Sequence, residues 1–169
     1  MKLSSLCIAS AAVGLSCMAA SSAVGGNFYE FEFVIDADQQ VPPNDSEGMG
    51  FGFVTLVDET LSFLLSWDIS WSDLSGPVTG MHFHGPADFG MGAGIQVDIG
   101  AISGLNSPSI GSTVIDNLQA AEILDGQWYV NIHTAMFPGG EIRGQVIPSP
   151  GALALLGLGG LLARRRRRR

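Results

Sequence analysis

The segment TLSFLLSWDISW, residues 60–71, alternates large apolar side chains with mostly polar ones along its whole length. Successive side chains of a β-strand point to opposite faces of a sheet, so the alternation predicts a half-buried strand with its apolar face in a core. Six positions form that apolar face: Leu61, Phe63, Leu65, Trp67, Ile69 and Trp71.

Similar segments lie on both sides of this strand. Phe31, Phe33 and Ile35 alternate with glutamates, and the segment 48–57 has a second alternating pattern. That pattern places five side chains on one face: Met49, Phe51, Phe53, Thr55 and Val57. Including residues 60–71, eight segments have the composition of short strands. The others are 28–35, 48–57, 80–84, 95–99, 112–115, 128–134 and 141–147.

One helix interrupts the strands. Asp116 or Asn117 can cap a helix over Leu118–Leu124, and Gly126 supplies the left-handed residue that ends it. Turns rich in Gly, Pro and Asp separate the remaining segments. Eight short strands and one short helix predict an all-β, single-domain fold, either an antiparallel β-sandwich or a Greek-key barrel.

The N-terminal segment has a different composition. Met1–Ala23 begins with the basic residue Lys2, continues with an apolar stretch and ends in small residues, which predicts an export signal peptide cleaved after Ala23. Lipidation of Cys17 is an alternative, although Gly14 stands where an aliphatic residue is expected. Cys7 and Cys17 are the only cysteines, so the exported domain would have neither disulfides nor thiolate metal ligands.

The C-terminal segment, 148–169, combines a proline turn, a short apolar run over 151–163 and a block of six arginines. A thirteen-residue helix is roughly 20 Å long, shorter than the ~30 Å hydrocarbon core, which predicts transient membrane insertion. The segment resembles a PEP-CTERM sorting signal, with Ser149 where that signal has Glu. The resemblance implies cleavage by an exosortase-type protease. The defining positions are Pro148, Pro150, Arg164 and Arg165.

The region between these ends, residues 24–147, is strongly acidic. Of the eight Lys and Arg residues, Lys2 lies in the predicted signal and six arginines in the tail, which leaves Arg143 against all sixteen acids and a formal charge of −15. Binding to nucleic acid or anionic lipid depends on basic side chains, so neither is an expected partner. The charge favours cations as ligands, or serves only to keep the domain soluble.

All three histidines lie in two of the predicted strands. His82 and His84 would share one strand face, and His133 would share a face with Tyr129 and Asn131. If these faces meet, three imidazoles converge in a pattern that Cu or Zn uses on β-sandwiches. The alternative is that the histidines form hydrogen bonds inside the domain.

Three further polar residues are expected to be structural or binding residues. Glu141 and Arg143 would share a strand face, which predicts a partly buried ion pair, with a binding role as the alternative. Asn131 is expected to bridge backbone groups or to orient an imidazole. The sequence has no Gly-x-Ser-x-Gly motif and no phosphate loop, and no catalytic residue is predicted.

Several of these motifs together resemble the CHRD domain, a family named from chordin and widespread in exported microbial proteins. They are QQVPP at 39–43, HFHGPA at 82–87, GQWYVNIHT at 126–134 and PGGEIRGQ at 138–145. Gln40 and Phe83 depart from the residues usual in the family. The resemblance covers most of 24–147 and implies a β-sandwich, with no defined molecular activity.

Two functions follow as expectations. The favoured one is an exported, non-enzymatic protein of the bacterial cell surface or extracellular matrix, which binds or adheres to an extracellular polysaccharide or a surface protein. The alternative is a Cu- or Zn-binding, or redox, metalloprotein that uses His82, His84 and His133. The His-x-His pair loosely resembles copper-zinc superoxide dismutase, but the chain has no fourth histidine to bridge a second metal.

Overall fold

A computed structural model describes residues 27–147. The predicted signal peptide, 1–23, and the predicted sorting tail, 148–169, lie outside the described residues. All eight predicted strands are present, and the all-β prediction is confirmed. The strands are β1 (Phe28–Asp36), β2 (Met49–Asp58), β3 (Phe63–Ser72), β4 (Val78–His84), β5 (Ile95–Asp98), β6 (Ser109–Ile115), β7 (Tyr129–Thr134) and β8 (Ile142–Gln145).

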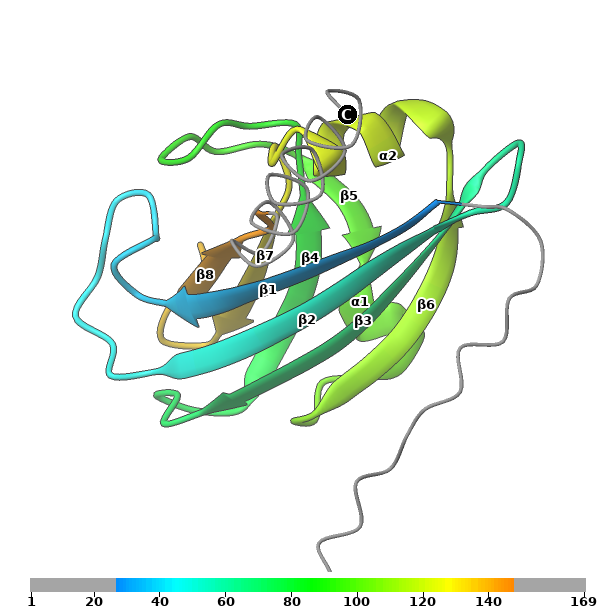
Figure 1. The fold of residues 1–169 in the computed structure, drawn as a ribbon. Helices are drawn as coiled ribbons and strands as arrows, with labels where there is room; N and C mark the ends of the chain where they lie inside the picture. The colour runs from blue at the N-terminus through cyan, green and yellow to red at the C-terminus, as the bar shows by residue number, and fades with distance from the viewer. Residues whose placement is uncertain (1–26, 148–169) are drawn as a thin grey trace, which may run out of the picture.

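The strands form one antiparallel sheet in the order β5-β4-β7-β8-β1-β2-β3-β6. Only one residue pair, Asp36 with Arg143, joins β1 to β8 in the ladder. At this junction the sheet turns, so that β1, β2, β3 and β6 lie across the other four strands (Figure 1). The fold is therefore a single curled sheet whose two halves face each other like the layers of a sandwich, with β5 and β6 as its edges.

The core lies between these two halves. Trp67 on β3 meets Phe83 on β4 with ring centroids 5.7 Å apart, and Phe83 in turn lies 6.1 Å from Trp128. The alternation that predicted β3 is confirmed from Leu65 to Ile69, whereas Leu61 lies in the preceding turn and is 86% exposed. Aromatic contacts across the layers thus fix how the two halves stack.

The face of β2 that packs on the core is not the face that carries the larger apolar side chains. Met49 and Phe51 are exposed, and the core face carries Gly52, Val54 and Leu56. Residues paired across neighbouring strands share a face, and Gly52 is paired with Phe33 on β1. A Cβ atom at Gly52 would lie 2.4 Å from the Phe33 ring, so the glycine makes room for this aromatic side chain.

Residues 27–147 contain two short helices rather than the single helix expected. The predicted helix is α2 (Asn117–Leu124), where Asp116 and Gln119 form a capping box and Gly126 has a φ of +73°. The second is α1 (Ile99–Ser103), capped by Asp98 through a hydrogen bond from the Ala101 amide. Five residues are too few to show a helical period. Among the described residues, no helix is long and apolar enough to cross a membrane.

Candidate metal centre

The three histidines lie on the face of β4 and β7 that points away from the core. Met81 and Phe83 on β4 are fully buried in the core, so His82 and His84 project to the opposite face. The same alternation on β7, which is next to β4 in the sheet, places His133 on that face too. Core packing on one side of two neighbouring strands therefore orients all three imidazoles.

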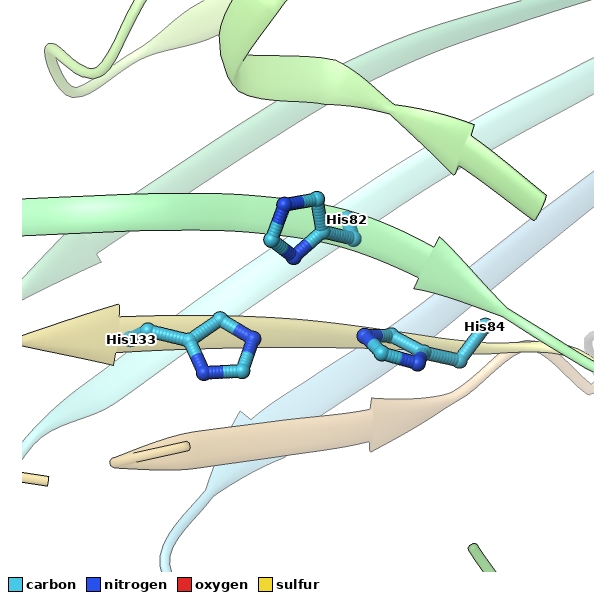
Figure 2. A group of neighbouring side chains, drawn as sticks. All are labelled: His82, His84 and His133. Atoms are coloured by element: carbon cyan, nitrogen blue, oxygen red, sulfur yellow. The ribbon is translucent and has the colours of Figure 1, made fainter. Parts of the chain in front are cut away.

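The three rings converge (Figure 2). One ring nitrogen from each histidine lies within 4.8 Å of the others. The ring centroids are 5.1 Å apart for His82 and His133, 5.6 Å for His82 and His84, and 6.1 Å for His84 and His133. Zinc–nitrogen bonds are about 2.0–2.1 Å long, so small ring rotations would bring the three nitrogens into bonding distance of one ion.

One nitrogen on each ring faces a hydrogen-bond acceptor. His84 Nδ1 lies 3.0 Å from the Ala93 carbonyl oxygen, and His133 Nδ1 lies 3.0 Å from that of Pro138. His82 Nε2 lies 3.9 Å from a carboxylate oxygen of Asp98. In metal sites, carbonyl acceptors such as those of Ala93 and Pro138 hold the N–H of a ligating imidazole and fix the tautomer that leaves the other nitrogen free. The Asp98 contact is longer than a hydrogen bond and acts on His82 through its charge.

The remaining nitrogens have no partner. His82 Nδ1, His84 Nε2 and His133 Nε2 are buried and form no hydrogen bond with the described residues. A buried polar atom without a partner costs about 1–3 kcal/mol. Three such atoms in one place could serve as the donor set for a metal ion, with a further coordination position available to another ligand.

The protonation state suits a metal ligand. Burial lowers the pKa of His84 below 6.5, an effect that the hydrogen bond to Ala93 opposes and the neighbouring His82 and His133 reinforce. Burial likewise lowers the pKa of His133, against the raising effect of its hydrogen bond to Pro138. Both imidazoles are thus neutral at pH 7, which is the form that binds a metal ion.

Tyr129 and Arg143 support the position of His84. The Tyr129 ring stacks on the His84 ring with centroids 5.1 Å apart and planes 8° from parallel. The Arg143 guanidinium lies 3.6 Å from the centroid of the same Tyr129 ring. The Tyr129 hydroxyl accepts a hydrogen bond from the Ala93 amide, so the loop that orients His84 also holds the tyrosine.

Comparison with protein families places the chain in a family on a basis independent of this geometry. The model of the CHRD domain matches residues 31–146, which is more than half of the chain. The chain belongs to the CHRD domain family. Neither the curated proteins nor the solved structures give a match. Membership accounts for the shared sequence motifs of this CHRD domain, and the function of the histidines has to be argued from their geometry.

Glu141 and Arg143 do not form the expected ion pair in the CHRD domain. Arg143 donates to the Gln145 side chain and packs on Tyr129. Glu141 instead accepts hydrogen bonds from the Ser46, Ser75 and Thr134 side chains. The two residues therefore serve different parts of the domain: Arg143 lies beside the histidines, and Glu141 joins separate loops.

Asn131 acts on the hairpin between β7 and β8. Its amide donates to the Gly139 carbonyl at 3.3 Å, and its oxygen accepts a hydrogen bond from Gln40 at 2.6 Å. Gly139 follows Pro138, whose carbonyl faces His133. Asn131 forms no hydrogen bond with an imidazole, so it influences the centre of the CHRD domain through the hairpin rather than directly.

Three residues at the centre could not be identified from the sequence. Ala93 and Pro138 contribute only backbone carbonyls, which leave no side-chain signal. Asp98 lies opposite His82 in the pairing of β4 with β5. Its spacing along the chain gives no hint of this contact, because the contact depends on the register between two strands.

Proposed function

We propose that this CHRD domain is a metal-binding module that holds a Cu or Zn ion with His82, His84 and His133. The observation that carries the proposal is the set of three neighbouring buried ring nitrogens without partners. A bound ion would satisfy all three at once. The acidic domain would also raise the local concentration of cations.

The direct test is a metal titration of the full chain. After removal of bound metal, calorimetry with Zn²⁺ and with Cu²⁺ is expected to give one site per chain with a Kd below micromolar. Elemental analysis of protein purified from its native host would identify the metal carried in the cell. A chain that binds neither ion at micromolar concentration would contradict the proposal.

We expect metal binding to survive mild acid. Protons compete with a metal for imidazole only near and below the pKa, and burial lowers the pKa of both His84 and His133 below 6.5. The decline of affinity with falling pH, measured by competition with a metal indicator, should therefore be centred below the ~6.5 at which free imidazole becomes protonated. Circular dichroism at each pH would separate metal loss from acid unfolding. A decline centred at or above 6.5 would disagree with burial of the two rings.

Asp98 is expected to orient His82. Replacing it by asparagine, Asp98→Asn, removes the carboxylate charge but keeps a side chain that can cap α1. Replacing the charged partner of a ligating imidazole by a neutral one is expected to cost a metal site about 10-fold or more in affinity. Calorimetry should show this loss for Zn²⁺ while the unfolding temperature of the metal-free chain stays the same. Equal affinities would mean that Asp98 only caps the helix.

We propose in addition that the module is exported and acts by binding rather than by catalysis. Support comes from the signal-like composition of 1–23 and from the resemblance of 148–169 to a sorting signal. Mass spectrometry of the protein from the cell envelope should find a mature form that begins at Val24 and ends between Pro148 and Gly151. A form that retains Arg169 would show that the tail stays attached as an anchor.

A further inference from the structure

Trp71 is the tryptophan that remains partly exposed. Trp67 and Trp128 are 2% and 0% exposed and belong to the core, whereas Trp71, at the end of β3, packs against the core and is only partly buried. Two hollows of about 470 Å³ and 330 Å³ flank it, and both include Trp71 in their walls. Trp71 is therefore the aromatic residue that lines both hollows of the surface.

The loop beside Trp71 is held in place. The Ser107 hydroxyl accepts a hydrogen bond from the Trp71 amide and donates one to the Trp71 carbonyl, both at 2.9 Å. These two bonds fasten the segment before β6 to the end of β3, at the same end of the sheet (Figure 1). This wall of the larger groove is thus preformed, which reduces the conformational entropy that the loop would lose when a ligand binds.

Polar side chains surround the aromatic ring. Asp73 and Asn106 are exposed and line the larger groove, together with Ser72. Asp73 has a φ of 58°, a left-handed conformation uncommon outside glycine, and the Ser72 hydroxyl donates to its carboxylate. The Asn106 side chain forms no hydrogen bond with the described residues, so both its donors and its acceptor are available to a ligand.

We propose that the grooves around Trp71 bind a neutral polysaccharide chain. A sugar ring has an apolar C–H face that packs on an aromatic ring, and hydroxyl groups at its edge that pair with carboxylate and amide side chains. The larger groove, which Trp71 lines together with Asp73 and Asn106, offers a ligand an aromatic side chain and polar partners at the same place. The walls contain Asp73 and no basic residue, which disfavours acidic polysaccharides.

This site is separate from the histidine centre. No residue that lines either groove belongs to the metal centre. None of them forms a hydrogen bond with its three histidines. A chain in which all three histidines are replaced by alanine should therefore bind glycan as the wild type does. Glycan binding and metal binding can then succeed or fail independently.

The test uses the full chain and a panel of cellohexaose, laminarihexaose and maltohexaose, with hexagalacturonate as the acidic comparison. Calorimetry is expected to detect binding of at least one neutral hexasaccharide and no binding of hexagalacturonate. Trp71→Ala should weaken that binding by about 10-fold or more, because the aromatic platform is lost. Asn106→Ala should weaken it by about 2- to 10-fold, the effect of one or two hydrogen bonds.

Two variants keep the result interpretable. Trp71 also packs on the core, so Asn106→Ala, at an exposed position, tests the site without disturbing the fold. Asn117→Ala is the matched control, since Asn117 is also exposed but lies on α2, outside both grooves. The proposal is overturned if the wild type binds none of the neutral probes, if it binds hexagalacturonate equally well, or if Asn106→Ala binds like Asn117→Ala.

Discussion

Replacing His133 with alanine is expected to abolish most of the affinity for Zn²⁺ and Cu²⁺, a loss of about 100-fold or more. Removal of a residue that only orients a ligand already costs about 10–100-fold, and loss of one of three ligands should exceed that. His82→Ala and His84→Ala should have effects of the same size, because each ring contributes one of the three converging nitrogens. Calorimetric titration of each metal-free variant measures the effect.

The control for these variants is Leu61→Ala, at a position 86% exposed in the turn before β3. Its metal affinity should equal that of the wild type. Near-ultraviolet circular dichroism would show that the histidine variants remain folded. If single variants bind zinc as tightly as the wild type, the histidines do not form one site, and the convergence of their rings is structural packing only.

Which strands form could be predicted from local patterns, but the face that each strand buries could not always be predicted. For β3 the larger side chains face the core, as the alternation indicates. For β2 the choice depends on Phe33, a residue of β1 whose ring needs the space at Gly52. On β2, contacts with the neighbouring strand determine which face is buried. The sequence pattern of a single segment does not reveal such contacts.

The histidine cluster could be predicted in part for a similar reason. A period of two places His82 and His84 on one face whatever the fold. Their meeting with His133 requires β4 to pair with β7 in one particular register, in which Gly80 lies opposite His133 and His82 opposite Asn131. Gly80 carries no side chain, which leaves room for the rings of His82 and His133 beside it.

Glu141 shows why an ion pair predicted from sequence spacing alone can be wrong. Its separation of two residues from Arg143 suggests an ion pair, but Glu141 lies before β8 begins and faces other loops. One carboxylate oxygen accepts hydrogen bonds from the Ser46 hydroxyl and the Ser75 amide, each at 2.7 Å. The other accepts from the hydroxyls of Ser75 and Thr134. A single buried carboxylate thus ties together the β1–β2 loop, the β3–β4 loop and the end of β7.

We therefore expect Glu141→Ala to lower the free energy of unfolding by about 3 kcal/mol or more. Each buried donor left without an acceptor costs about 1–3 kcal/mol, and the substitution leaves several donors without an acceptor at once. Glu141→Gln, which keeps the shape but not the charge, should cost about 1–3 kcal/mol. Urea denaturation of the metal-free chain at pH 7 measures both. Glu30→Gln, on the exposed face of β1, is the matched control and should have little effect.

The same carboxylate makes this difference depend on pH. Burial raises the pKa of Glu141, but the hydrogen bonds from Thr134, Ser46 and Ser75 together outweigh it and hold the pKa below 4.5. A carboxyl whose pKa is lower in the folded state stabilises the fold above its unfolded pKa and loses that contribution as the pH falls through the folded value. The stability gap between wild type and Glu141→Gln should therefore be constant above about pH 5 and shrink in stronger acid, where the wild-type carboxyl becomes neutral like the amide. A gap of the same size at every pH would mean that Glu141 stabilises the loops by its shape and not by its charge.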